Sequence, residues 1–508
     1  MPDVPPPVTT HPRLLTRGPV RWWAIGAVLA VALVLLAAIS ARFLVTQARQ
    51  AANRMPAPAW PLLRPLALAP SPPGMRARAV AVAGGRAVVL FTSDPPPCPA
   101  GARCPTPASA GQLDVLDGGS GRVLARQALP TTAVAPTARW LLADVAAQRV
   151  YAPAPDGVAV FSLDDAQLLA HWPLADGEVV GAALDRQGRL AIATTRALLR
   201  LDPASGQVAA RQALPSGGDV TLAGPVYDAH ADVLAVLASR AGSAPTLLRF
   251  RADALQSLGA VTLPAEMTLG PADPRGGVLL SGAGGRVWWL ASSAESAPGA
   301  PPRLIERPAL REARALGWDV ARGRTLAVLP GGLVALATAN GREEAAPVAG
   351  LPLAIAWPAE QPLAVDGARG RLYLPVGADG LLIAPTSPAP QAEPLDNLTA
   401  SLLARAALAR LLPPPSQQPP FFRASDLPIL PGPRAWSFWV HAGDLGWLGP
   451  FAGTLRTSIT PRAGQPGAYA ITYEVAWEQL FRRTHTWRLA VAPDGAMRLI
   501  DERGDALP

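Results

Sequence analysis

Short apolar runs, separated by polar turns that contain glycine, recur along most of the chain. The recurring unit is an aspartate, a turn rich in glycine, arginine or alanine, and then an apolar run that alternates as a β-strand does. Six copies begin at Asp144, Asp185, Asp228, Asp273, Asp319 and Asp366, at intervals of 41, 43, 45, 46 and 47 residues. A degenerate copy over residues 80–89 precedes them, which makes seven.

Several units contain a second turn, as at Asp117-Gly118, Asp202 to Gly206 and Asn340-Gly341. Asn-Gly is a strong hairpin signal, and four short strands in about 40–45 residues are typical of a propeller blade. A helical solenoid does not fit, because glycine and proline interrupt the chain too often for paired helices. The pattern predicts a mainly β fold with a seven-bladed β-propeller over residues 75–391.

The seventh unit is too short for four strands. Only a short stretch separates Asp366 from residues 375–394, which are rich in proline and alanine and predict a linker. We expect a strand from residues 62–70 to complete this blade, because such a closure joins both ends of the ring and removes exposed sheet edges.

At these repeats the chain resembles the seven-bladed propellers of the YVTN, NHL and WD40 types. The stretch from Asp144 to Leu174, with Arg149-Val150-Tyr151-Ala152, is nearest to the YVTN pattern, and the resemblance covers roughly residues 62–391. Tyr151 and Tyr373 are the only tyrosines placed as that pattern requires. The resemblance implies the architecture alone, because propellers carry many unrelated activities.

Residues 395–508 predict a small α+β domain. A helix begins at Asp396 or Asn397 and ends before Pro413, with leucines at 398, 402, 408 and 412 along one side. Alternating apolar residues then predict an antiparallel meander, most clearly over residues 469–477 and 485–491. This element order is similar to that of the cystatin or NTF2-type folds.

Twenty uncharged, mostly apolar residues over 22–41 predict a single transmembrane helix, because this length spans the hydrocarbon core of a bilayer. A cleaved signal peptide, with Ala38-Ile39-Ser40 as its cleavage site, is the alternative, but its apolar region is normally shorter. The helix follows a short cytoplasmic tail over residues 1–21 and precedes a proline-rich stalk over residues 42–74. Membrane lipid is therefore one expected partner.

Three arginines flank the span on each side, so the positive-inside rule does not orient it. The cysteines Cys98 and Cys104 favour an extracytoplasmic body, because a pair that closes a small loop suits a disulfide in an oxidising compartment. Two unrelated free thiols are the alternative. The 21-residue tail is too short to fold, which also argues against a transmembrane sensor.

Charge changes the expected class of partner. The 508 residues are 50% apolar and carry a formal net charge of +8, and all the basic residues are arginine, which suggests the codon usage of a GC-rich bacterium. Residues 1–54 hold six arginines and one acid, so most of the excess flanks the membrane span, where anionic lipid attracts it. The composition excludes a disordered chain and makes nucleic acid an unexpected partner.

The candidate chemistry is sparse. The five histidines show no metal-ligand spacing, so no metal or cofactor is expected. The repeated aspartates are interpreted as turn caps in preference to a ring of ligands. An acid–base cleft would need Glu474, Glu478, His485 and Glu502 together, but a solvent-exposed sheet face explains them more simply.

The sequence therefore predicts a membrane-anchored, extracytoplasmic propeller that acts as a non-enzymatic binding or scaffolding module for a protein or cell-envelope ligand. The alternative is a propeller hydrolase, similar to a lactonase, that uses aspartates and arginines of the central channel. In that case Asp228 and Asp319 are the carboxylates whose removal would abolish metal binding.

Overall fold

The computed structural model describes residues 54–55, 64–93, 111–129, 140–264, 266–273, 276–282, 285–291, 303–313, 315–329, 332–339, 342–349, 363–387, 394–412, 424–441, 446–478 and 482–505. The chain divides into two units, residues 1–54 and 55–508, with the two-residue strand β1 (Arg54–Met55) at their boundary. The expected tail, the membrane span, Cys98 and Cys104 lie outside the described residues. No helix within the described ranges is long and apolar enough to cross a membrane.

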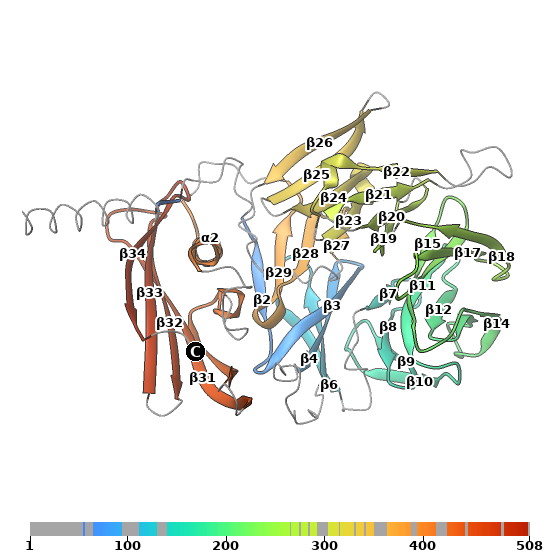
Figure 1. Cartoon of the computed structure of the whole chain (residues 1–508), viewed down its shortest axis with the longest axis horizontal. Coiled ribbons are helices and arrows are strands. Elements are labelled where there is room, and N and C mark those ends of the chain that lie inside the picture. Colours follow the sequence, from blue (N-terminus) through green and yellow to red (C-terminus); the bar gives the residue numbers. More distant parts are fainter. Residues whose placement is uncertain are drawn as a thin grey trace, which may run out of the picture. The chain divides into compact units, whose positions relative to one another are not determined.

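Seven four-stranded antiparallel sheets make up the first part of the second unit, and six of them use consecutive strands (Figure 1). The first three sheets contain β3 (Met75–Ala83), β4 (Arg86–Ser93), β5 (Gly111–Asp117) and β6 (Val123–Leu129); β7 (Leu142–Asp144), β8 (Arg149–Ala154), β9 (Gly157–Ser162) and β10 (Leu168–Pro173); and β11 (Val179–Leu184), β12 (Leu190–Thr194), β13 (Ala197–Leu201) and β14 (Val208–Ala213).

The next three contain β15 (Val220–Asp228), β16 (Val233–Arg240), β17 (Thr246–Arg251) and β18 (Ser257–Thr262); β19 (Thr268–Ala272), β20 (Val278–Ser281), β21 (Val287–Leu290) and β22 (Leu304–Glu306); and β23 (Ala315–Asp319), β24 (Arg324–Leu329), β25 (Gly332–Ala339) and β26 (Arg342–Ala349). The seventh contains β27 (Ala364–Asp366), β28 (Arg371–Pro375), β29 (Gly380–Pro385) and β2 (Ala67–Pro70). Short 3-10 helices lie in connections of the described ranges, namely η3 (Pro308–Leu310), η4 (Val320–Arg322), η5 (Gly377–Asp379) and η6 (Ala424–Asp426).

The first strands of the seven sheets contact one another in a closed series, from β3 through β7, β11, β15, β19, β23 and β27 back to β3. Sheets arranged in such a ring are the blades of a β-propeller. The structure therefore shows the propeller that the repeats predict. Blades are numbered one to seven, beginning with the blade of β3.

Strand β2 is the outer strand of blade seven, where it runs antiparallel to β29 with Ala69 opposite Leu381 (Figure 1, blue beside orange). The strand expected from residues 62–70 thus lies in the last blade. The linker predicted over residues 375–394 is wrong for residues 380–385, which form β29. Their side chains explain the difference, because Leu381, Leu382 and Ile383 are fully buried in the blade.

Position within a blade explains the sequence pattern. The second strands, such as β8 and β12, are buried along almost their whole length, whereas the outer strands β14 and β18 are mostly exposed. A strand that packs on both faces needs a continuous apolar run, and an exposed outer strand does not. The apolar runs that define the repeat are therefore the middle strands of the blades.

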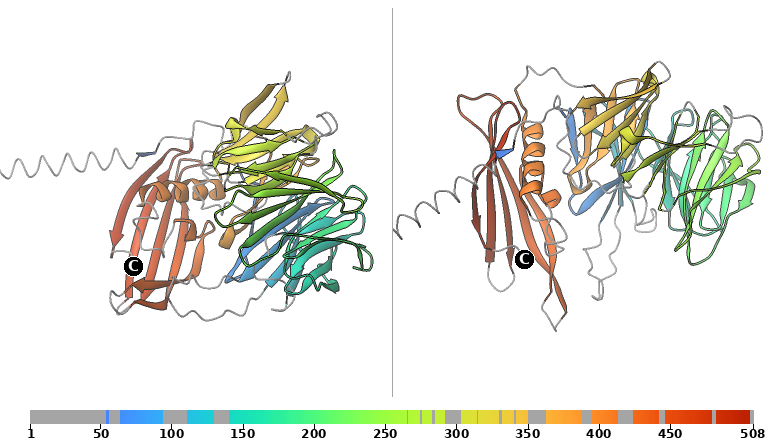
Figure 2. Two further views of the ribbon diagram at one scale, coloured as in Figure 1. Left: turned by 45° about the vertical axis from the view of Figure 1, so that its right-hand side comes forward. Right: turned by 45° about the horizontal axis from the view of Figure 1, so that its top comes forward.

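The second part of this unit is one helix and an antiparallel meander. Helix α2 (Asn397–Leu411) begins at the N-cap Asp396, whose carboxylate accepts a hydrogen bond of 2.7 Å from the Thr399 amide. The meander runs in the order β34-β33-β32-β31-β30, and Figure 2 shows α2 along one face of it. Its strands are β30 (Gly432–His441), β31 (Trp447–Pro461), β32 (Tyr469–Glu478), β33 (Arg482–Val491) and β34 (Met497–Gly504).

Helix α2 contributes side chains to two hydrophobic cores. Leu398 and Leu402 pack with residues of blades six and seven, whereas Leu408 and Leu412 pack with the aromatic face of the meander. The leucines therefore do not form the single side that the sequence predicts. A helix that is apolar around most of its circumference is one that is covered on more than one side.

Candidate functional site

The repeated aspartates lie at the end of the first strand of their blades, and all six are buried. The carboxylates of four of them, Asp144, Asp185, Asp228 and Asp366, accept hydrogen bonds from amides of the turn that follows. Asp144 accepts from the Ala147 amide at 3.0 Å, and Asp185 accepts from the Gln187 amide at 2.8 Å. This is the turn-capping role that the sequence predicts.

Arginine side chains also form ion pairs with several of these carboxylates. Asp319 is fully buried, and its Oδ2 accepts from Arg322 and from Arg324, each at 3.1 Å. Asp366 pairs with Arg369 at 3.1 Å. Across the described ranges no three histidine, cysteine or acidic side chains come close enough to hold a metal ion.

An arginine at the start of the second strand reaches across to the next blade. Arg86 of blade one donates to the Leu163 carbonyl of blade two at 3.1 Å, and Arg149 of blade two donates to the Pro203 carbonyl of blade three. Arg324 of blade six donates to the Thr386 carbonyl of blade seven at 2.9 Å. Each acceptor lies within two residues of the end of a third strand. The sequence analysis missed this contact, although the arginine recurs at a fixed place in the repeat.

The seam between blades seven and one differs from the others. Here the hydroxyl of Tyr373 donates to the Gly118 carbonyl at 2.8 Å, and Gly118 holds the place that Leu163 and Pro203 hold elsewhere. The side chain of Arg371, the first residue of β28, makes no hydrogen bond or ion pair with a described residue. The Gly118 amide also donates to the Gly85 carbonyl at 3.0 Å. A Cβ at Gly118 would lie 2.6 Å from that carbonyl oxygen, so only glycine allows this approach.

A cavity of about 450 Å³ opens at the same seam and is called the seam depression below. It is lined by Gly84, Gly85, Arg86, Asp117, Gly119, Leu124, Arg369 and Arg371. Asp117 is occupied by its own turn, because Oδ1 accepts from the Ser120 hydroxyl at 2.6 Å and the Ser120 amide at 2.7 Å. These hydrogen bonds from Ser120 hold the pKa of Asp117 below its usual value.

Apolar side chains are exposed at the start of the outer strands in four consecutive blades. They are between 38% and 54% exposed and are called the apolar rim below. The apolar rim consists of Val123, Leu124, Leu168, Leu169, Val208 and Leu258. Single exposed leucines are ordinary, but the same position repeated in blades one to four forms a regular surface feature.

The predicted acid–base cleft is divided between the two faces of the meander. His485 and Trp487 lie opposite Val475 and Tyr473, on the face that packs on α2, whereas Glu474 and Glu478 point to the other face. On the first face, Glu502 accepts from Trp487 at 3.1 Å and lies 3.2 Å from Nε2 of His485. The structure therefore brings His485 and Glu502 together but not all four residues. The aromatic run from Tyr469 to Trp487 is core, as predicted.

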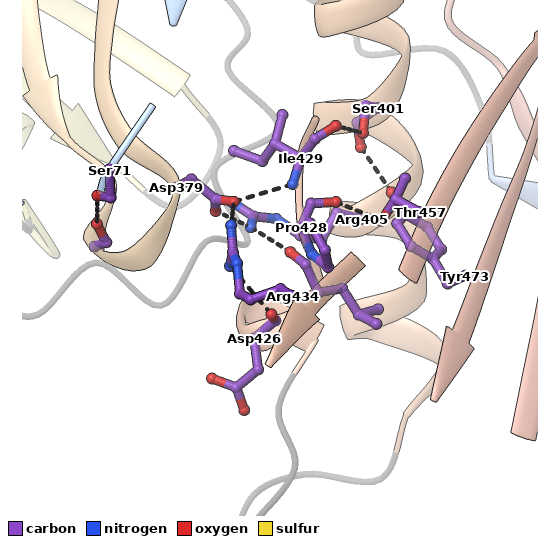
Figure 3. A network of polar contacts seen from close by, with 12 residues as sticks. Ser71, Asp379, Ser401, Arg405, Asp426, Pro428, Ile429, Arg434, Thr457 and Tyr473 are labelled. Carbon is purple, nitrogen blue, oxygen red and sulfur yellow. Dashed lines mark hydrogen bonds and ion pairs between the residues drawn. The ribbon is translucent and has the colours of Figure 1, made fainter. Parts of the chain in front are cut away.

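A buried polar network joins blade seven to α2 (Figure 3). Asp379, in the turn before β29, pairs with Arg405 of α2 and with Arg434 of β30, and its Oδ1 accepts from the Ile429 amide at 3.0 Å. The side chains of Asp379 and Arg405 are each only 2% exposed. Because the network has little access to solvent, it holds the two parts together and offers no binding site.

No known protein family and no curated protein sequence matches the chain. Among solved structures, the Cps50 (Swd1) β-propeller domain of Myceliophteria thermophila matches with 12% sequence identity and a TM-score of 0.41. The match covers 61% of this chain and 99% of that chain. The mitotic checkpoint complex matches with 11% identity, 66% and 95% coverage and a TM-score of 0.45. Virginiamycin B lyase from Staphylococcus aureus matches with 10% identity, 62% and 96% coverage and a TM-score of 0.44. The strand pairing of the chain itself defines the propeller.

Proposed function

We propose that the protein is a non-enzymatic binding or scaffolding module whose protein partner docks on the apolar rim. The observation that carries this proposal is the repetition of exposed apolar side chains at one position of four consecutive outer strands. Arginine lies beside them, since the side chain of Arg126 on β6 is 53% exposed. Contiguous exposed apolar residues mark interaction sites, and arginine is enriched at protein–protein interfaces.

The proposal extends to where the module works. Residues 22–41 anchor the chain in a bacterial membrane as a single pass, with residues 1–21 in the cytoplasm and the propeller outside it. This part rests on the length of the apolar run and on the two closely spaced cysteines Cys98 and Cys104 in the sequence. The partner is then a protein or another component of the cell envelope.

The test uses the full chain isolated from its native membranes together with the proteins bound to it. Leu168 and Leu169 lie side by side on β10, so Leu168→Asp/Leu169→Asp places two charges on the apolar rim. Val320→Asp is the matched control, because Val320 is 68% exposed in blade six, away from the rim. We expect a stoichiometric partner with the unaltered chain and the control, and loss of that partner with the double variant. Equal recovery with all three proteins would overturn the proposal.

One observation favours the alternative, a propeller hydrolase similar to a lactonase. Oδ1 of the buried Asp319 has no hydrogen-bond partner within the described part of the chain. A hydrolase of this kind would bind a divalent metal in the purified protein and lose it in Asp319→Asn and Asp228→Asn. If metal content is the same in the unaltered protein and both variants, this alternative fails.

A further inference from the structure

The seam depression contains Arg371. In other blades the corresponding arginine donates to a backbone carbonyl of the next blade, but at this seam Tyr373 donates to that carbonyl. In blade two, the first residue of the second strand is Arg149, which donates to the Pro203 carbonyl of the next blade. The hydroxyl of Tyr151, two residues later, is buried and donates to no acceptor among the described residues, and it interacts with the side chain of Arg149. Arginine holds the carbonyl there, and the tyrosine does not.

Blade seven reverses this arrangement. Its corresponding residues are Arg371 and Tyr373, and here the tyrosine hydroxyl donates to the corresponding carbonyl, that of Gly118. The Arg371 side chain makes no hydrogen bond to this carbonyl among the described residues. Arg371 therefore keeps its guanidinium donors unused by the described residues, and it lines the seam depression.

The other two arginines of the depression are already in ion pairs, Arg86 with Asp164 and Arg369 with Asp366. The Asp117 carboxylate also lines the depression, and its Oδ1 atom accepts hydrogen bonds from its own turn. The lining therefore carries three arginines against one acid, and Arg371 is the arginine without an ion pair among the described residues. Arg369 remains available for a second contact, because its side chain is half exposed.

We infer that the seam depression binds an oxyanion, a carboxylate or phosphate group of a small ligand, through the guanidinium of Arg371 with Arg369 beside it. The planar guanidinium fork matches two oxygens of either group, and such charge-assisted hydrogen bonds are the strong ones. A cavity of about 450 Å³ is the size of ordinary small-molecule sites. Leu124 supplies an apolar wall for the rest of the ligand. This inference does not depend on a protein partner at the apolar rim.

Isothermal titration of the full chain with inorganic phosphate, and separately with succinate, tests the site at low ionic strength. The arm that binds more tightly identifies the ligand as phosphate-bearing or carboxylate-bearing. We expect Arg371→Gln to weaken binding by about tenfold or more, the usual effect of losing a hydrogen bond to a charged group. Arg371→Lys keeps the charge without the fork and should bind with intermediate affinity.

Arg488→Gln is the matched control, because Arg488 is exposed on β33 of the meander and does not line the depression. It should bind phosphate or succinate as the unaltered protein does. Because the Arg371 side chain makes no hydrogen bond or ion pair with a described residue, Arg371→Gln should keep a urea midpoint close to that of the unaltered protein. Absence of binding to both anions, or equal binding by Arg371→Gln and the unaltered protein, would overturn the inference.

Discussion

The hydroxyl of Tyr373 lies 2.8 Å from the carbonyl oxygen of Gly118, so a buried hydrogen bond joins blade seven to blade one across 255 residues of sequence. Within blade one, the Gly118 amide donates to the Gly85 carbonyl, which fixes the position of the acceptor. The tyrosine hydroxyl makes the contact between the two blades at this point. Substitutions at this seam therefore test directly how the ring is closed.

Tyr373→Phe should destabilise the protein by about 1–3 kcal/mol, because it leaves the buried Gly118 carbonyl without its donor. Tyr151→Phe is the matched control, since its hydroxyl is buried and donates to no acceptor among the described residues. Removing that hydroxyl should leave stability unchanged or slightly higher. Urea unfolding followed by tryptophan fluorescence measures both, and equal losses would contradict the assigned hydrogen bond.

We expect alkaline pH to destabilise the folded protein through ionisation of its tyrosines. Burial is the largest cause that raises the pKa of all five, and it raises the pKa of Tyr373 to about 12. The folded state therefore holds these protons more tightly than the unfolded state, in which tyrosine titrates near about pH 10. The resulting stabilisation is complete below about pH 10 and is lost as the pH rises from about 10 to about 12.

We expect tyrosinate absorbance to stay low at about pH 10 and to appear together with unfolding at higher pH. In Tyr373→Phe the loss of stability over this interval should be smaller. Ionisation of most tyrosines near pH 10 while near-ultraviolet circular dichroism remains native would disprove the raised pKa values.

Asp228 links two blades as well as its own turn. Its Oδ1 accepts from the His230 amide at 3.0 Å, and its Oδ2 accepts from the Gly277 amide of blade five at 2.7 Å. Asp228→Asn replaces one acceptor with a donor, so we expect a loss of about 1–3 kcal/mol and faster hydrogen exchange at Gly277. Asp202→Asn alters an exposed turn cap and should cost less. Unchanged exchange at Gly277 would rule out the link.

The pair Asp379 and Arg405 should be far more sensitive than an exposed ion pair. Arg405→Met leaves a buried carboxylate that still faces Arg434, and breaking a buried pair costs about 3–5 kcal/mol. Arg211→Met is the control, because the Arg211 side chain is 53% exposed and its pair with Asp176 is worth about 0–1 kcal/mol.

The double variant Asp379→Leu/Arg405→Met should recover part of the stability that Arg405→Met loses, because the buried carboxylate is removed together with its buried partner. The recovery is only partial, since Arg434 then loses its ion pair with Asp379 and keeps its hydrogen bond to the Asp426 carbonyl. Urea midpoints of the two single variants and the double variant give the coupling between the two residues. Additive losses would show that the pair does not act as one unit.

The repeat pattern was sufficient to predict the blades, because each blade is built from neighbouring strands and its turns carry local signals such as the aspartate caps. The exchange between Arg371 and Tyr373 was not predictable, since it depends on a carbonyl that only ring closure brings near. The network around Asp379 was missed for a related reason. Periodicity identifies apolar faces, and it does not indicate which charged side chains a second packed surface will bury.

Strand β2 also sets an order of events during synthesis. Ala69 pairs with Leu381, so the partner of one of the first strands to leave the ribosome is made more than three hundred residues later. Until then β2 and the open side of the first blade present unpaired strand edges, which favour association with other chains. Contacts this distant in sequence slow folding. The protein therefore passes through a long interval in which six blades exist and the ring does not, and a chaperone would act on it during that interval.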